Sequence, residues 1–266
     1  MKSLKSAVLS GKKVWILPLI VAGSLLLGAG GAVRAQDAAP PSSAWHYDLV
    51  IFGWGSGLSG SVGPNVNELQ VKESFSGLAS HLDMAFMGHF EANNGTWGIL
   101  VDPIYVDLGD DAHNGAGYPV NLDLKQFIGG LAGSYRLYRS PKTTFDLTFG
   151  IRYNELKTTI TPYLLPKQSR SISWTDPVVG LKGGVQMSKV WSFGYRADVG
   201  GFGVGSRLTW MGMAQFSAKV SKCCSLGVGY LYYYVDYEKD AGRHDRGSFV
   251  YDMAQAGPIL AVAFHW

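Results

Sequence analysis

Apolar and polar residues alternate along most of this chain, and that period of two constrains its fold more than any other feature. The alternation continues from residue 45 to the last residue without a linker or an internal repeat. Alternation over this length predicts strands whose two faces meet different environments. We expect ten strands, at residues 45–60, 80–92, 96–107, 125–139, 143–158, 174–187, 191–200, 206–220, 224–238 and 249–266.

The connections between these segments differ in length. Asn94-Gly95 and the turns that begin at Ser140, Ser188 and Ser221 contain two or three residues and suit hairpins. Most other connections are longer, at 61–79, 108–124, 159–173 and 239–248, whereas the glycine-rich 200–205 is short. Short turns at one end and long loops at the other are typical of outer-membrane barrels. The pattern predicts one all-β domain, an up-and-down antiparallel transmembrane barrel of ten strands, with eight or twelve as alternatives.

The two faces of the predicted strands have different chemistry. One face is apolar and holds residues such as Leu131, Leu147 and Ile151, whereas the other holds most of the charge. The charged face carries Asp83, His89, Glu91, Asp102, Arg136, Asp146, Arg152, Asp176, Lys182, Arg196, Asp198 and Arg207. A membrane barrel would turn the apolar face to lipid, and a soluble sandwich would bury it. Alternation alone fits both.

The positions of the aromatic residues distinguish these folds. Five aromatic residues lie on the apolar face close to a short turn or a chain end: Trp45, Trp97, Phe145, Trp191 and Trp266. A second group, Tyr105, Tyr153, Trp210 and Tyr232, lies toward the long loops. Two aromatic girdles around an aliphatic band favour a membrane barrel, because indole and phenol rings prefer the bilayer interface. We expect the last strand to pair with the first and to complete the periplasmic girdle with Trp266.

Residues 1–35 have the composition of a cleaved signal peptide. Lysines precede an apolar run at 14–27, and the small residues Val33 and Ala35 precede the expected cleavage site at Gln36. A polar lead at 36–43 and a barrel domain at 44–266 follow. Five of the 23 basic residues lie in the signal, which leaves 18 basic against 20 acidic residues in the exported chain. That balance does not favour nucleic acid as a partner.

Three stretches resemble a widespread family of small, poorly characterised Gram-negative outer-membrane β-barrels of porin-like or surface-antigen type: AFMGHFEANNGTWGILVDPIYVDL, WTDPVVGLKGGVQMSKVWSFGYRADVGGFGVGSRLTW and GPILAVAFHW. The resemblance covers nearly the whole exported chain, and WTDPVVG and RADVGGFGVGS are its most specific blocks. It implies the fold, a place among outer-membrane lipid and lipopolysaccharide, and no reaction. The chain departs from the family by lacking an arginine near Leu231 and by ending in Trp instead of Phe. Its aromatic terminus resembles the signal that the barrel-assembly machinery reads.

Charged residues on the inward face are expected to pair inside the barrel. Centring the turn on Pro141 places Arg136 opposite Asp146, which predicts a cross-strand ion pair. A second layer, nearer the long loops, would consist of Asp83, Asp102, Arg152, Asp176, Arg196, Asp198 and Arg207. The signs nearly balance, as expected where unpaired buried charge is expensive. We interpret this layer as a structural network that would also line any constriction, although such clusters can mark active sites.

The sequence predicts no cofactor and no metal. GGFGVGS lacks the lysine and the following helix of a phosphate-binding loop, and GDDAHNG, at 109–115, does not have EF-hand spacing. The histidines show no metal-ligand spacing. Cys223 and Cys224 are adjacent, which excludes a disulfide of ordinary geometry and leaves a strained vicinal bond as the alternative. Each Asp-Pro step, at Asp102 and Asp176, is expected to form a bulge.

These features predict an integral outer-membrane barrel without catalysis, acting as a membrane scaffold or a narrow pore for small solutes. The alternative is an outer-membrane enzyme, an omptin-like protease or a lipid hydrolase, with its site at the extracellular rim. His113 with Asp110 and Asp111 would then be the nearest candidates for catalysis. All three lie in one expected loop, which would not hold them opposite each other as an acid–base pair requires.

Overall fold

The computed structural model describes residues 44–63, 69–113, 119–162, 166–239 and 249–266. The expected signal peptide and polar lead lie outside these residues. The elements are β1 (His46–Trp54), β2 (Gly57–Gly63), β3 (Leu69–Glu73), α1 (Phe75–Ala79), β4 (Leu82–Asn93), β5 (Trp97–His113), β6 (Pro119–Arg139), β7 (Thr143–Pro162), β8 (Gln168–Gln186), β9 (Trp191–Gly201), β10 (Leu208–Lys219), β11 (Cys224–Lys239) and β12 (Phe249–His265).

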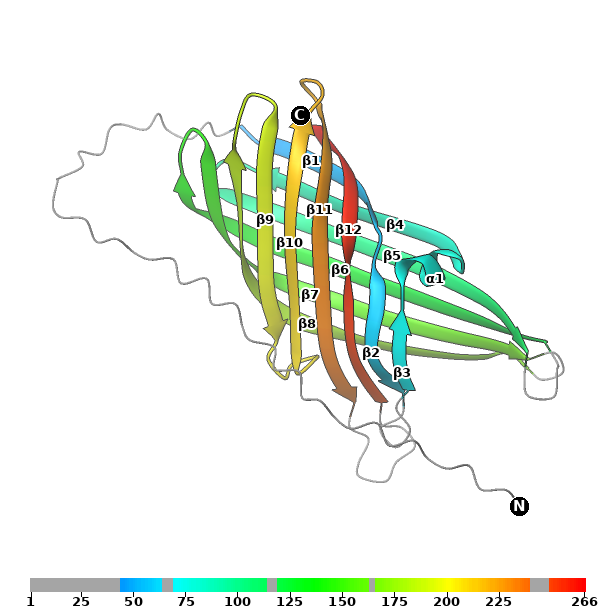
Figure 1. Ribbon diagram of the computed structural model, residues 1–266. Coiled ribbons are helices and arrows are strands. Elements are labelled where there is room, and N and C mark those ends of the chain that lie inside the picture. Colours follow the sequence, from blue (N-terminus) through cyan, green and yellow to red (C-terminus); the bar gives the residue numbers. More distant parts are fainter. Residues whose placement is uncertain (1–43, 64–68, 114–118, 163–165, 240–248) are drawn as a thin grey trace, which may run out of the picture. The chain divides into compact units, whose positions relative to one another are not determined.

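The strands form a closed antiparallel barrel (Figure 1). Each strand from β4 to β12 pairs with the next along the chain, and β1 closes the ring by pairing with both β4 and β12. β2 continues the line of β1 along β12, so β1 and β2 together make one interrupted wall strand. β3 adds a short strand to the edge of β2. The predicted ten-stranded up-and-down barrel is therefore confirmed.

Several strands extend beyond their predicted ends. β5 runs to His113 and pairs there with Pro119 of β6, so much of the stretch expected to be a loop belongs to a hairpin. β7 and β8 extend in the same way. The expected 61–79 loop contains β3 and α1, whose first turn is capped by the Ser74 hydroxyl. Alternation in the sequence fades in these extensions, and the ladder hydrogen bonds to a neighbouring strand keep them extended instead.

The expected bulges at the two Asp-Pro steps are wrong. The register between β5 and β6 passes through Asp102 and Pro103 unchanged. Pro177 lies one residue outside the β8–β9 ladder, which begins at Val178, so its missing N–H breaks no bond on that edge. Register shifts occur instead between Leu82 and Met84 and between Arg136 and Tyr138.

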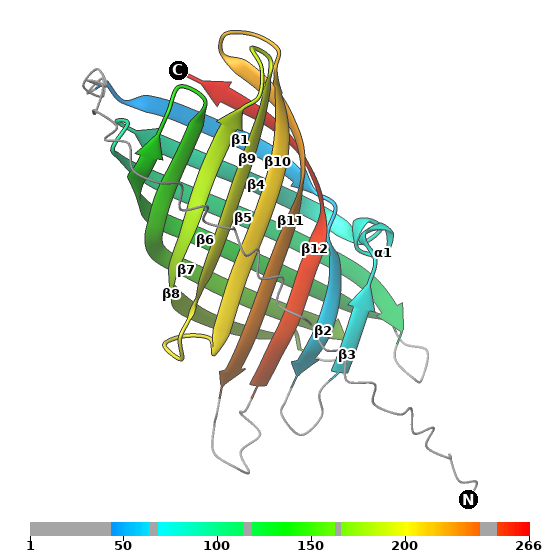
Figure 2. The ribbon, with the colours of Figure 1, turned by 60° about the vertical axis from the view of Figure 1, so that its left-hand side comes forward.

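The barrel is apolar outside and packed inside. Trp45, Trp97, Trp191 and Trp266 are exposed on its outer surface, and Phe145 is half-buried there. Figure 2 shows how the strands of one wall, β9 to β12, cross those of the other, β4 to β8. The buried core lies inside this wall, and its larger members include Trp54, Met87, Leu156, Trp174, Tyr233 and Tyr251. Within the described segments, no helix is long and apolar enough to cross a membrane.

Candidate functional site in the barrel lumen

Charged side chains inside the barrel form one continuous chain in which acidic and basic groups alternate. We call this series the ion-pair chain. It runs through Arg136, Asp146, Lys182, Glu91, His89, Asp102, Arg196, Asp198 and Arg152. Four carboxylates meet four permanent cations and one histidine along it, so its charge is nearly balanced.

The part of the ion-pair chain nearest the short turns links four strands. Arg136 on β6 lies directly opposite Asp146 on β7 and forms an ion pair with it. Asp146 Oδ2 is 3.3 Å from Lys182 Nζ on β8. Lys182 Nζ in turn lies 2.5 Å from Glu91 Oε1 on β4. Because β8 and β4 are not neighbours in the sheet, this last contact spans the lumen.

The other part of the ion-pair chain links β4, β5, β9 and β7. His89 Nδ1 is 2.5 Å from Asp102 Oδ1, and Arg196 Nη1 donates to Asp102 Oδ2 at 2.8 Å, again from a strand that is not a neighbour. Arg152 Nη2 donates to both carboxylate oxygens of Asp198 at 2.7 and 2.8 Å. The Arg152 and Asp198 side chains are only 4% and 1% exposed. These contacts hold opposite walls of the barrel together.

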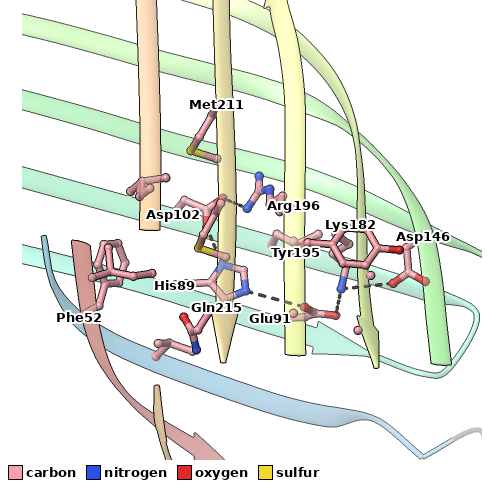
Figure 3. Close-up of a pocket in the computed structure, with 18 of the residues that line it drawn as sticks. Phe52, His89, Glu91, Asp102, Asp146, Lys182, Tyr195, Arg196, Met211 and Gln215 are labelled. Carbon is pink, nitrogen blue, oxygen red and sulfur yellow. Dashed lines mark hydrogen bonds and ion pairs between the residues drawn. The ribbon is translucent and has the colours of Figure 1, made fainter. Parts of the chain in front are cut away.

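A cavity of about 280 Å³ lies beside the ion-pair chain (Figure 3). Charged residues of the chain, among them His89, Glu91 and Lys182, form one side of its lining. The other side is apolar and consists mainly of Val50, Phe52, Met211, Met213, Leu231 and Ile259. The paired glycines Gly184 and Gly194 also line the cavity, and their missing side chains help to leave it empty.

The lumen toward the long loops is filled by aromatic and aliphatic side chains, which we call the plug: Trp174, Tyr233, Val235, Tyr237, Tyr251 and Met253. The Trp174 and Tyr237 rings stack with centroids 4.1 Å apart. The Tyr233 hydroxyl donates to Asn154 Oδ1 at 2.7 Å. All six plug residues are buried, so the lumen is packed at this level.

Asp176 anchors the turn between β9 and β10. Its side chain is fully buried and accepts hydrogen bonds from Trp174 Nε1 at 3.1 Å and from the backbone N–H of Ser206 at 2.6 Å. The turn includes Phe202, whose φ of 50° lies in the left-handed region that non-glycine residues rarely adopt. The two hydrogen bonds tie this turn to the plug.

Three residues expected in the charged layer lie outside the ion-pair chain, namely Asp176, described above, Asp83 and Arg207. The Asp83 side chain is exposed, near Gly109, at the register shift in β4. Arg207 is exposed as well and pairs with Asp236 at 3.3 Å and with Glu238 at 2.6 Å. Their places are taken by His89, Glu91 and Lys182, which the alternation had placed on the inward face but not in this network. The cross-lumen distances that select these three cannot be read from a single strand.

The other residues considered from the sequence, for catalysis, disulfide formation or metal binding, do not form a site among the described residues. Asp110, Asp111 and His113 belong to β5, and their side chains lie outside the described residues. Cys223 and Cys224 are free thiols with sulfurs 3.4 Å apart, and hydrogen bonds from Ser221 and Cys224 hold the pKa of the Cys223 thiol below its usual range. Within the described ranges, no group of three or more His, Cys, Asp or Glu residues is placed to hold a metal ion.

A closed ten-stranded barrel with an apolar outer face and a charged, packed lumen belongs to the class of barrels found in outer membranes. No family model and no curated protein sequence matches the chain. Among solved structures, the Ail attachment invasion locus protein of Yersinia pestis, in complex with the heparin analogue sucrose octasulfate, aligns with a TM-score of 0.39 and 9% identity over 84% of this chain and 98% of its own.

Two autotransporter structures align similarly. The translocator domain of NalP from Neisseria meningitidis has a TM-score of 0.44 and 10% identity, covering 83% of this chain and 88% of its own. The transport unit of AIDA-I from Escherichia coli has a TM-score of 0.43 and 9% identity, covering 88% and 93%. Likenesses at this level carry no conclusion about what this chain binds or does.

Proposed function

We propose that this protein is an integral barrel of the Gram-negative outer membrane that acts as a membrane scaffold with a closed lumen and without catalysis. The observation that carries this proposal is the inverted distribution of side chains. Large apolar residues such as Ile99, Leu131 and Ile151 are about half exposed on the outer wall, whereas Arg152, Asp176 and Asp198 are buried inside. So large an apolar outer surface would be unfavourable in contact with water, and soluble proteins rarely expose apolar patches of this extent.

A closed lumen is favoured over the narrow pore. A barrel of about eight strands is just filled by its side chains, and an open aqueous channel needs about sixteen. Here the plug and the contacts between Lys182 and Glu91 and between Arg196 and Asp102 both occupy the lumen. A solute crossing the barrel would have to displace both.

The closed lumen predicts that the reconstituted protein shows no steady conductance in planar bilayers. Replacing Trp174 and Tyr237 together by alanine should give brief, small conductance steps, because it removes the stacked pair at the centre of the plug and leaves only the ion pairs across the lumen to be displaced. The matched control replaces Trp97 and Tyr135, an aromatic pair on the outer face with centroids 4.7 Å apart, and should remain silent. Steady channels in the unmodified protein would contradict the closed lumen.

We propose that β12 is the strand that the barrel-assembly machinery engages, and this predicts a role for Trp266. Its backbone N–H and C=O both bond to Tyr47 of β1, at 3.1 and 3.0 Å, and its ring stacks on Tyr47 at 5.8 Å. Trp266→Ala removes a contact worth about 1 kcal/mol and should reduce the outer-membrane level several-fold, whereas Trp266→Phe should be tolerated.

The measurement is the amount of heat-modifiable protein in outer-membrane fractions. Trp210→Ala is the control, because Trp210 also stacks on an outward tyrosine, Tyr232, but lies in β10, away from the closing strands. Equal levels of the two alanine variants would show that closure does not depend on Trp266. Recovery of the unmodified protein as a soluble periplasmic species would overturn the membrane assignment itself.

A further inference from the structure

The barrel wall is interrupted between β1 and β4. These strands pair from His46↔Asn93 to Ile51↔Gly88 and no further. Beyond that point β2 pairs with β12 and β3, while β4 pairs only with β5. We call the two stretches that lack a partner on this edge, residues 52–57 and 82–87, the wall break. Both ribbon views place α1 between β3 and the far end of β4, beside this break (Figures 1 and 2).

The wall break lies at the depth of the apolar outer belt. Strands tilted by about 40° and rising about 3.3 Å per residue cross a band about 25 Å tall in about ten residues. Counted along β4 from Asn93, that band includes Phe86 and Met84, whose side chains are about half exposed. Open sheet edges do not occur against lipid unless protein covers them or a cavity lies behind them. Among the described residues, the Phe75 ring of α1 lies beside Gly55 and covers only that end of the break. The edges at residues 52–54 and 82–87 still need something to cover them.

The lumen cavity reaches the end of the break. Ile51↔Gly88 is the last pair between the two strands, and Gly88 and the neighbouring Phe52 both line the cavity. At about 280 Å³ the cavity is slightly smaller than the sites of roughly 300 Å³ or more that enclose a whole drug-sized ligand. The cavity is large enough for the polar head group of a ligand whose apolar part lies outside the cavity.

The surroundings of the cavity offer hydrogen-bond donors without a strong net charge. The Trp54 Nε1 group, at the end of β1 beside the break, is buried and has no hydrogen-bond partner among the described residues. Nε of Arg196, a residue that lines the cavity and is 8% exposed, also makes no hydrogen bond and has only the Asp198 carboxylate near it, at 3.8 Å. The carboxylates of the lining are paired with Lys182, Arg196 and His89. A head group with no net charge fits this lining better than an anion or a cation, since either would leave an unbalanced charge buried.

We propose that the cavity and the wall break form one binding site for a single-chain amphiphile with a zwitterionic head group. The head occupies the cavity between the ion-pair chain and the apolar lining, and the alkyl chain passes through the break into the bilayer. The chain thereby covers the strand edges that would otherwise face lipid. This inference rests on the proposed membrane location.

The test uses full-length protein in liposomes and lysophosphatidylcholine with a photoreactive group in its alkyl chain. Mass spectrometry of the crosslinked peptides should place adducts on residues 52–54 and 84–88. Gly194→Leu should reduce these adducts at least fivefold, because a side chain there enters the cavity and its Cβ meets only one backbone atom, at 3.9 Å. Gly212→Leu, on the outer face of β10, is the matched control and should not change them.

A second pair of variants tests the break without filling the cavity. In a Cys223→Ser, Cys224→Ser background, a disulfide between Gly53→Cys and Phe86→Cys would close the break, since continuing the β1–β4 register brings these positions opposite each other. No atom lies within 4 Å of the Cβ site at Gly53, so the new side chain is accommodated. Closure should abolish the adducts, whereas a disulfide at Leu49 and Phe90, in the paired part of the wall, should not.

Each outcome separates this inference from the proposed function. A barrel that does not insert into liposomes contradicts the membrane location. A barrel that inserts but shows adducts only on the outer belt, or whose adducts survive both Gly194→Leu and the break-closing disulfide, overturns the binding site alone. Equal or stronger labelling by a photoreactive fatty acid or alkylammonium probe would overturn the assignment of a zwitterionic head group.

Discussion

Arg152→Leu is expected to destabilise the folded barrel by about 3–5 kcal/mol, because it leaves a buried carboxylate without its main partner. Asp198 accepts two hydrogen bonds from the Arg152 guanidinium, and its other cation, Arg196, is 3.8 Å away. The measurement is the urea midpoint for loss of the heat-modifiable form in liposomes or detergent. We expect a clear decrease in that midpoint.

The double variant Arg152→Leu, Asp198→Leu should recover much of the loss, since an apolar pair in place of a buried ion pair is often tolerated. Arg196 keeps its contact with Asp102 in this variant. Lys125→Met is the matched control, because Lys125 pairs with Asp107 at 2.6 Å but its side chain is 40% exposed. If the single variant unfolds at the same urea concentration as the control, the ion-pair chain does not stabilise the barrel.

Asp176→Ala is expected to have a comparable effect, a loss of about 2–6 kcal/mol. The substitution leaves two donors unsatisfied, the Trp174 Nε1 group and the Ser206 backbone N–H, each of which costs about 1–3 kcal/mol when buried. Because the Ser206 bond holds the turn between β9 and β10, we also expect faster trypsin cleavage after the neighbouring Arg207. Mass spectrometry of the fragments measures that cleavage directly.

Two further variants make this result specific. Asp83→Ala removes another acidic residue that alternation places on the inward face, but its side chain is exposed, and it should change neither stability nor cleavage. Asp176→Asn keeps an acceptor oxygen and should lie between the wild type and alanine. Unchanged cleavage after Arg207 in Asp176→Ala would show that Asp176 does not anchor the turn.

Local features of the lumen could be read from the sequence. The short turn around Pro141 determines which residues of β6 and β7 are opposite each other, and the expected placement of Arg136 against Asp146 is the one observed. The same argument does not reach Lys182 and Glu91, because β8 and β4 are separated by three other strands. Their contact depends on the tilt and stagger of the whole closed sheet.

The division of the first wall strand into β1 and β2 could not be predicted from the sequence. Residues 45–60 read as one strand, yet the pairing divides them, with β1 between β12 and β4 and β2 between β12 and β3. Nothing in the alternation marks Ile51 as the last residue paired with β4. The strand that pairs with a given edge is determined by the tertiary structure, because residues far apart in the chain supply the possible partners.

The sequence by itself determined the period of two, the apolar outer face, the aromatic girdles, the number of wall strands and the hairpin pairs, because these depend on neighbours within a strand or across one short turn. The tertiary structure alone decided the ion pairs across the lumen, the plug and the wall break. Those features join residues that are far apart in the chain, and their distances follow from the closure and stagger of the complete barrel.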